Sequence, residues 1–382
     1  MRSRLVRGGG GASGLFVLDA SSGEVVCSRA AARQRSLATN MKLFTTSTAL
    51  ARLGPGSRIA TRLEADGEVD RNGTLHGSLY LVGGGDPALG VPSFYDRFLG
   101  GLGTNIFGLK RGVREAGIRR VTGRLYADDS IFDRLRGVAD SGYATSPWIG
   151  PLSGLDFDSG YASPHGGGFA SDPARKAAAT LARSLRAAGV RIRARVGRRT
   201  APPGSATVAS VESPTLTDIV NTTDVYSDNF FAEMLVKLLG ARVGGAGTTA
   251  AGARVVERFA RAHGSGVHAV DGSGLTRSNR ASPRQVVALL DSVRATRAGE
   301  DLIQDMALAG HEGTVEDRMH GTAAYGRCRT KTGTLTGVSN LSGYCFNRDG
   351  KTMIFSILMS SVSDLYLAHL EQDLIAGEVA AY

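Results

Sequence analysis

Lysine is scarce in this chain of 382 residues: six of its 45 basic residues are lysines, and the other 39 are arginines. The six are Lys42, Lys110, Lys176, Lys237, Lys331 and Lys351. Arginine stays charged in proteins, so a basic residue that must give up its proton has to be one of these six. Two of them, Lys42 and Lys331, lie in short motifs described below.

Aromatic residues are also few, at 6%, and none is interleaved with the arginines of residues 191–199, the densest basic run. The net charge is +10. Nucleic-acid surfaces combine such charge with stacking aromatic side chains. The sequence therefore argues against a nucleic-acid partner and leaves attraction to an anionic polymer open.

Cysteine is limited to Cys27, Cys328 and Cys345, without the spacing of a metal site. The seven histidines form no cluster, so we predict no metal and no cofactor. Two interpretations of the cysteines stay open. They are three buried apolar thiols, or Cys328 and Cys345 face each other across a predicted hairpin.

Long apolar runs are absent: no segment reaches the ~18 residues that cross a bilayer, so we predict no transmembrane segment. Residues 1–14 are basic and glycine-rich, without the apolar core of a secretory signal, so no signal peptide is visible. We expect residues 1–13 to be flexible. On this reading, either the true start lies upstream or the protein stays inside the cell.

The length favours two domains. Strand patterns lie near both ends of the chain, with helical patterns between them, the first over residues 39–53. The strand patterns cover residues 15–18, 24–27, 327–334, 341–346 and 351–360. We therefore predict one α/β (α+β) domain, an antiparallel sheet flanked by helices, from residues 14–62 and 201–382. Residues 63–200 alternate short strands with Gly, Asp and Pro turns, which predicts a β-rich inserted domain.

Three short strings follow one another in the chain: Thr39-Asn40-Met41-Lys42, Ser227-Asp228-Asn229 and Lys331-Thr332-Gly333. In the first, Thr39 and Lys42 are three residues apart on a predicted helix and share one face. They pair a hydroxyl nucleophile with an amine base. Free lysine has a pKa near 10.4, which burial or the charge of Lys331 would have to lower. The alternative is that Thr39 is only a helix N-cap.

The second string supplies Ser227 as a hydroxyl for proton relay and Asn229 as an amide for the substrate backbone. Asp228, between them, is assigned to substrate binding.

The third string lies in a strand pattern, and a strand edge can bind an extended peptide. Lys331 and Thr332 would hold a C-terminal carboxylate, and Gly333 would let the substrate approach. The N–H of Thr334 would join that of Thr39 in an oxyanion hole.

Each string alone is common by chance, but the three in this order form a specific signal. The surrounding residues resemble those of the class C low-molecular-mass penicillin-binding proteins, which are D-alanyl-D-alanine carboxypeptidases/endopeptidases. The matching segments are residues 37–46, 79–87, 227–235, 271–275, 279–283 and 331–338. The likeness covers nearly the whole chain from Leu15 onward.

The resemblance implies a β-lactamase/transpeptidase-like fold and acylation at position 39. It also implies peptidoglycan stem peptides ending in D-Ala-D-Ala as substrates, β-lactams as inhibitors, an extracytoplasmic location and no cofactor. Two features depart from the family. Thr39 replaces a serine and carries an extra methyl on a stiff χ1, although threonine nucleophiles are known. The insert is also short, since Thr39 and Ser227 lie 188 positions apart.

Three hypotheses follow. The first is an active D,D-peptidase with a threonine nucleophile. The second is a catalytically impaired relative that binds peptidoglycan peptides. The third, a β-lactamase, is disfavoured because no Glu-x-x-Leu-Asn string lies between Asn229 and Lys331 to activate water.

Overall fold

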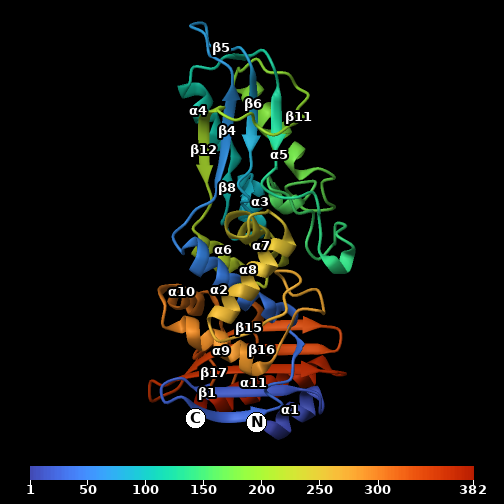
Figure 1. Ribbon diagram of the computed structural model, residues 1–382, viewed down its shortest axis with the longest axis vertical. Coiled ribbons are helices and arrows are strands. Elements are labelled where there is room, and N and C mark those ends of the chain that lie inside the picture. The colour runs from blue at the N-terminus through green and yellow to red at the C-terminus, as the bar shows by residue number, and fades with distance from the viewer. The chain divides into compact units, whose positions relative to one another are not determined.

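The computed structural model describes residues 1–382, which form two compact units (Figure 1). Unit 1 comprises Met1–Pro55, Leu216–Gly244 and Thr249–Tyr382, and unit 2 comprises Gly56–Thr215 and Gly245–Thr248. The expected border at residues 62/63 would cut strand β4 (Ala60–Asp66). That strand pairs with β12 (Ala206–Glu212) inside unit 2, so the unit begins before β4 and ends after β12.

Unit 1 contains an antiparallel sheet of six strands in the order β14-β15-β16-β17-β1-β2. Their bounds are β1 Gly14–Asp19, β2 Glu24–Arg29, β14 Ala307–Leu308, β15 Cys328–Leu335, β16 Val338–Phe346 and β17 Thr352–Ser360. Strand β1, blue in Figure 1, pairs with the late strand β17, in red. The prediction of an antiparallel sheet built from both ends of the chain is confirmed.

Helices cover both faces of this sheet. Successive strand residues point to opposite faces, and Phe355 and Ile357 of β17 lie in a buried cluster with Ile375 and Val379 of helix α11 (Leu365–Ala381). On the other face, the hydroxyl of Tyr344 donates to the main chain of helix α9 (Pro283–Arg294). The helices of unit 1 are α1 Arg2–Gly9, α2 Met41–Leu53, α6 Leu216–Val225, α7 Asn229–Val243, α8 Thr249–Ala262, α9 Pro283–Arg294, α10 Arg297–Asp305 and α11 Leu365–Ala381. Two short strands, β3 Arg35–Ser36 and β13 Arg280–Ala281, pair with each other.

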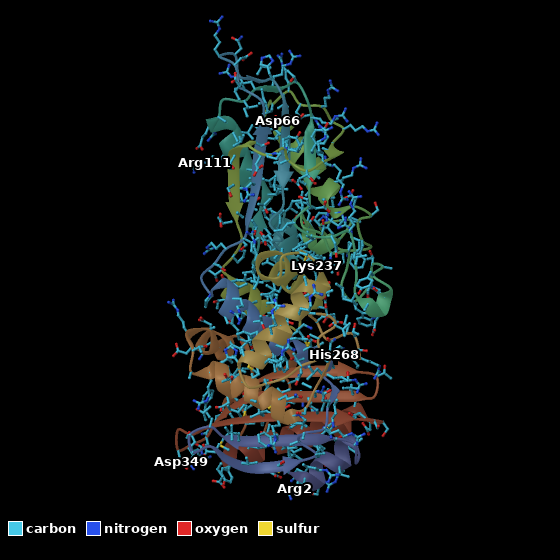
Figure 2. All side chains as sticks on the ribbon, viewed as in Figure 1. Arg2, Asp66, Arg111, Lys237, His268 and Asp349 are labelled. Carbon is cyan, nitrogen blue, oxygen red and sulfur yellow. A yellow bond between two sulfur atoms is a disulfide. The ribbon has the colours of Figure 1, made fainter.

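The prediction that residues 1–13 are flexible is wrong, because Arg2–Gly9 form helix α1; Figure 2 labels Arg2 at its start. Leu5 is fully buried, and Arg7 pairs with Glu371 of α11 at 2.9 Å. A Cβ at Gly8 would lie 3.0 Å from that of Glu371. The glycines therefore allow close packing here rather than flexibility.

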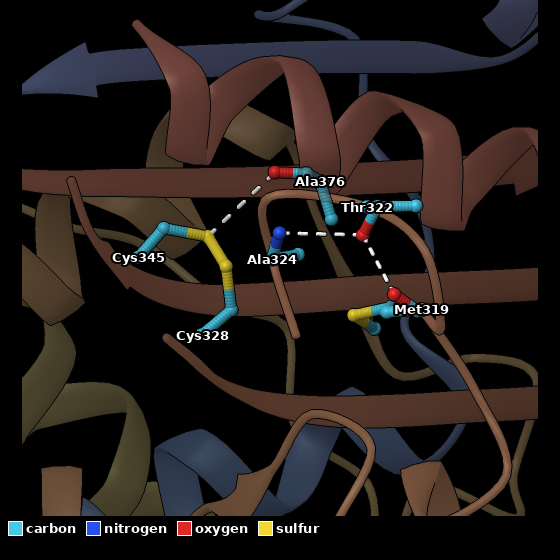
Figure 3. The surroundings of a disulfide bond; sticks show 6 residues. All are labelled: Met319, Thr322, Ala324, Cys328, Cys345 and Ala376. Atoms are coloured by element: carbon cyan, nitrogen blue, oxygen red, sulfur yellow. Dashed lines mark hydrogen bonds between the residues drawn. A yellow bond between two sulfur atoms is a disulfide. The ribbon is translucent and has the colours of Figure 1, made fainter. Parts of the chain in front are cut away.

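A disulfide joins Cys328 of β15 to Cys345 of β16 (Figure 3). The sheet register places these two residues directly opposite each other. Cys27 is buried and free. Of the two interpretations of the cysteines, the facing pair is therefore confirmed, and the buried thiol holds only for Cys27.

Unit 2 is built on a mixed sheet of five strands in the order β11-β10-β6-β4-β12. Besides β4 and β12, its strands are β5 Thr74–Leu75, β6 Ser78–Val82, β7 Leu89–Gly90, β8 Thr104–Asn105, β9 Arg120–Val121, β10 Leu125–Asp128 and β11 Gly197–Arg198. Its helices are α3 Pro92–Phe98, α4 Leu109–Glu115 and α5 Pro173–Ala187. The alanine and leucine stripe of α5 is buried in the core of this unit. In neither unit does a helix combine the length and apolar character needed to cross a membrane.

Candidate active site

Thr39 lies in a single 3₁₀ turn, Ala38–Asn40, directly before α2. Its hydroxyl donates to the main-chain oxygen of Thr332 in β15 at 2.9 Å. An N-cap side chain would instead accept from an N–H of the helix, and α2 has no side-chain cap. The N-cap interpretation of Thr39 is therefore wrong, and the helix starts two residues later than predicted.

Strand β15 packs tightly against this turn. The amide of Asn40 donates to the main-chain oxygen of Lys331 at 2.9 Å and accepts from the hydroxyl of Ser342 at 2.7 Å. A Cβ at Gly333 would lie 2.9 Å from the oxygen of Leu37 and 3.0 Å from the nitrogen of Asn40. Glycine is thus needed at position 333 for the strand to approach the turn, a constraint that the sequence interpretation assigned to the substrate.

Lys42 is fully buried at the start of α2. Its Nζ donates to Oδ1 of Asn229 at 2.7 Å and to the main-chain oxygen of Ser273 at 2.9 Å. Burial lowers the pKa of Lys42 to about 8, and four nearby carboxyl groups oppose that effect. They belong to Asp228, Asp224, Glu233 and Asp271. A lysine in this state is a base near neutral pH, and desolvation is the main cause.

Ser227 and Lys331 meet from opposite parts of the sequence. Ser227 lies between α6 and α7 with φ 57°, in the left-handed region that non-glycine residues rarely adopt. Its Oγ accepts from Nζ of Lys331 at 2.9 Å, and the same Nζ lies 3.2 Å from the oxygen of Thr332. Burial and the charge of Lys42 lower the pKa of Lys331 to about 7. From the sequence we expected the charge of Lys331 to lower the pKa of Lys42. Instead burial lowers the pKa of Lys42, and the charge of Lys42 lowers the pKa of Lys331.

The prediction that Asp228 binds substrate does not fit its geometry. Its carboxylate accepts from the N–H of Phe231 at 2.9 Å and caps the N-terminus of α7. Asn229 is the first residue of that helix, so the cap aims its amide at Lys42. We therefore assign Asp228 to holding α7 in place.

The two remaining predicted residues lie further along β15. The hydroxyl of Thr332 bonds to that of Thr314 at 2.9 Å, and Thr334 is exposed.

Residues 271–279 form a loop whose role the sequence did not predict. Asp271 accepts from the N–H groups of Gly274 and Thr276 at 2.8 Å each. Gly274 has φ 88°, and a Cβ there would overlap the main-chain oxygen of Ala38. The loop therefore packs against the turn of Thr39 and presents the Ser273 oxygen to Lys42. The string Asp271-Gly272-Ser273-Gly274 was the available signal.

Glu233 supports the same loop from α7. Its Oε1 accepts from the N–H of Gly272 at 3.0 Å and from that of Ser273 at 2.7 Å. Burial and the charge of Asp271 raise the pKa of Glu233 to about 8.

Asp224 of α6 is the other residue that sequence reasoning missed. It is fully buried, and neither carboxylate oxygen has a hydrogen-bond donor in the protein. The hydroxyl of Thr46 faces it but gives its proton to the main-chain oxygen of Lys42 at 2.7 Å. Burial raises the pKa of Asp224 to about 6, and the charges of Lys331 and Lys42 oppose that rise. No motif marks this aspartate.

The structure thus places the five predicted catalytic residues in two neighbouring hydrogen-bonded groups, and the charges of Lys42 and Lys331 interact across them. Thr39 and Lys331 both bond to the Thr332 oxygen, and Lys331 also bonds to Ser227. Lys42, one turn beyond Thr39, forms the second group with Asn229. The arrangement combines a hydroxyl, a lysine with a lowered pKa and a second lysine, which are the parts needed for acyl transfer.

Comparison with known proteins agrees with this chemistry. Residues 7–166 and 168–376 match the D-Ala-D-Ala carboxypeptidase 3 (S13) family. The chain is 30% identical over 455 residues to a D-alanyl-D-alanine carboxypeptidase from Actinomadura sp. (strain R39), covering 98% of this chain and 82% of that protein.

Two crystal structures of penicillin binding protein 4 from Haemophilus influenzae are similar to the structure of this chain. Each is 20% identical and covers 100% of this chain and 99% of that one, with TM-scores of 0.84 and, in complex with a β-lactam, 0.79. The chain therefore has the β-lactamase/transpeptidase-like fold that the resemblance implied.

Proposed function

The chain belongs to the D-Ala-D-Ala carboxypeptidase 3 (S13) family, and from this we propose that it cleaves D-alanyl-D-alanine ends of peptidoglycan stem peptides through an acyl-enzyme on Thr39. The observation that carries the proposal is the buried Lys42 with its pKa lowered to about 8, one helical turn from the Thr39 hydroxyl. Such a lysine can take a proton from a hydroxyl nucleophile.

In the proposed reaction, Oγ1 of Thr39 attacks the carbonyl carbon of the penultimate D-alanine, and Lys42 receives its proton. The N–H groups of Thr39 and Thr334 stabilise the resulting oxyanion. The peptide C–N bond then breaks, and the terminal D-alanine leaves as an amine that takes its proton through Ser227. Water releases the acyl group from Thr39 in the second half of the reaction.

In this scheme Lys42 must be neutral to act as a base, and Lys331 must be protonated to bind a carboxylate. The proximity of the two lysines favours a state in which only one of them is charged. Two buried ammonium groups disfavour each other, so the pair binds its two protons in separate steps. Between these steps one proton is shared. A substrate carboxylate beside Lys331 would draw that proton to Lys331 and leave Lys42 neutral, as a base requires.

A second function, binding without catalysis, is favoured by one observation. The Thr39 hydroxyl donates to the Thr332 oxygen, and Lys42 donates to Asn229 and Ser273. The nucleophile must therefore rotate before Lys42 can accept its proton. The γ-methyl of threonine moves with it, and a stiff χ1 makes that rotation costly.

We also propose an extracytoplasmic location. The Cys328–Cys345 disulfide supports it, since disulfides persist mainly in oxidising compartments. β-Lactams are the expected inhibitors, because they acylate the same hydroxyl that the peptide would.

Labelling with a fluorescent penicillin tests the proposal. We expect the purified chain to form a covalent adduct at Thr39, visible as the added mass of one penicillin. Thr39→Ala abolishes the adduct, and Thr39→Ser, which lacks the methyl, forms it faster. The wild-type chain also releases D-alanine from a peptide ending in D-Ala-D-Ala.

If the wild-type chain takes no label while Thr39→Ser does, the binding function replaces the catalytic one. If neither takes label although both fold, the assignment of position 39 is wrong. Rapid turnover of a chromogenic β-lactam without a stable adduct would instead indicate a β-lactamase.

A further inference from the structure

Basic residues are segregated within unit 2. Residues 107–124 and 183–195 contain eleven lysines and arginines and one acidic residue, Glu115. Elsewhere in Gly56–Thr215, acidic residues outnumber basic ones by 14 to 10. A chain that merely favours arginine everywhere would not show this asymmetry within one compact unit.

The two segments lie side by side. The N–H of Arg191 donates to the oxygen of Arg119 at 2.8 Å, and the N–H of Val121 donates to that of Arg191 at 2.9 Å. Helix α4 and the C-terminal end of α5 together line a cavity of about 620 Å³. We call this surface the basic face; it comprises Lys110, Arg111, Arg114, Arg119, Arg120, Arg124, Arg183, Arg186, Arg191, Arg193 and Arg195.

The charges of the basic face are accessible and largely uncompensated. Nine of its arginines are exposed, and Figure 2 labels Arg111 on α4. Arg111 pairs with Glu115 at 2.7 Å, and the other ten basic residues form no ion pair. Folding has therefore gathered like charges without neutralising them, and their mutual repulsion falls when an anion binds.

The chemistry of the face narrows the choice of partner. Membrane-binding surfaces add exposed apolar anchors to basic charge, but no large hydrophobic residue of these two segments is exposed. Single-stranded nucleic acid needs aromatic side chains for stacking, and Phe107, the one aromatic residue here, lies beneath the ammonium group of Lys110. What remains is a dense array of guanidinium groups, which match phosphate oxygens in pairs.

We propose that the basic face is a docking surface for a linear anionic polymer with phosphodiester repeats, such as those attached to cell walls. A flexible chain carrying one charge per repeat can contact several arginines at once without a fixed register. The proposal goes beyond the peptidase function: it concerns where the protein is held, and its failure would leave acylation of Thr39 untouched. Its choice of polymer rests on the proposed extracytoplasmic location.

The test uses the full chain and lipid-free poly(glycerol phosphate), with binding measured by fluorescence anisotropy. We expect binding at about 50 mM salt that weakens steeply as salt rises, since counterion release drives such contacts. The variant Arg114→Gln/Arg119→Gln/Arg186→Gln is expected to bind about tenfold more weakly or worse. The matched control Arg97→Gln/Arg134→Gln/Arg175→Gln removes the same charge from exposed positions of unit 2 outside the face and is expected to change binding less than about twofold.

Both triple variants should melt, and take penicillin label, like the wild-type chain, which separates binding from folding and from catalysis. Equal loss in the two variants would overturn the proposal, because net charge alone would explain the binding. Absence of wild-type binding would overturn it too. Tighter binding to phosphatidylglycerol vesicles, or to single-stranded DNA, than to poly(glycerol phosphate) would replace the polymer with a membrane or a nucleic acid.

Discussion

Asp224 determines how much positive charge the buried lysine pair carries. Lys42 and Lys331 lie in one buried site, and the unpartnered carboxylate of Asp224 is close enough to raise the pKa of each. Its own pKa of about 6 means that it is ionised at neutral pH. The three groups together then carry less charge than two ammonium groups would, which makes it easier for Lys331 to stay protonated.

Other carboxyl groups lie near Asp224 and Lys42, and one of them provides a control for the role of Asp224. Helix α10 contributes Asp305, whose pKa burial and the charge of Asp224 raise to about 8. Glu233 and Asp271 act on Lys42 from α7 and the following loop. Asp305 is thus neutral at pH 7, and replacing it with asparagine does not change the charge at this position.

We expect Asp224→Asn to move the pH profile of penicillin labelling to lower pH by about one pH unit. Loss of the negative charge lowers the pKa of Lys331, so Lys331 loses its carboxylate-binding charge at a lower pH. It lowers the pKa of Lys42 as well, so neutral Lys42 becomes available as the base at a lower pH. Below pH 6 wild-type Asp224 is itself protonated, and the difference should vanish. The measurement is the labelling rate between about pH 5 and 9, which spans the pKa values of all three groups.

Asp305→Asn is the control and should leave the profile unchanged below pH 8. A uniform loss of rate in Asp224→Asn, with no shift along the pH axis, would mean that Asp224 serves only the packing of α6.

At the residue scale, the sequence motifs predicted which side chains lie in the site but not their hydrogen-bond partners. Thr39 and Lys42 are near each other because one helical turn separates them. Their actual partners, Thr332 and Ser273, lie more than two hundred residues away in sequence. Those contacts depend on how β15 and the loop at residues 271–279 pack, which a local pattern does not encode.

Strand β15 is the element on which the site depends most, and three features hold it. It pairs with β16 along its whole length, the Cys328–Cys345 disulfide joins the two strands, and Asn40 bonds to it from the turn of Thr39. Lys331 is three residues from the disulfide on the same strand. Cys328 and Cys345 are both fully buried, so the disulfide lies within the core of unit 1.

We expect Cys328→Ala/Cys345→Ala to lower the free energy of unfolding by about 2–4 kcal/mol, because the cross-link restricts the unfolded chain. Denaturant unfolding measures the change. Cys27→Ala removes a buried sulfur without removing a cross-link, so any loss there reflects packing alone. Adding reductant should destabilise Cys27→Ala but not the double variant. If reductant affects both variants alike, the disulfide is not the source of the stability.

Elements with a strong local pattern were predictable from the sequence, whereas their ends and joints were not. Helix α2 and strands β1, β15, β16 and β17 appear where hydrophobic periodicity predicts them. Helix α1 was missed because its two glycines are poor helix formers, and burial against α11 stabilises it. The left-handed conformation of Ser227 between α6 and α7 was also not predicted, since residues other than glycine rarely adopt it.

At the scale of the whole molecule, the chain leaves unit 1 and returns to it at nearly the same point. The N–H of Thr217 donates to the oxygen of Pro55 at 3.1 Å. Within unit 2, the first and last strands are neighbours, with Ala60 opposite Glu212. Residues 56–215 therefore begin and end beside two neighbouring residues of unit 1, while Gly245–Thr248 form a second, short segment of unit 2. Composition revealed the existence of the insert, but not its borders, because β4 and β12 look like any other short strands.

Because the two ends of the insert lie beside each other, unit 1 can be tested without residues 56–215. We expect a chain in which a short glycine-serine linker replaces residues 56–215 to fold cooperatively, because the linker must span only the gap between two hydrogen-bonded residues. All five predicted catalytic residues remain in it, so it should still form the penicillin adduct, which mass spectrometry detects. It also lacks the basic face and should no longer bind poly(glycerol phosphate). A variant that melts without cooperativity would show that unit 1 needs the insert to fold. One that folds but takes no label, when the full chain does, would place part of the acylation machinery in residues 56–215.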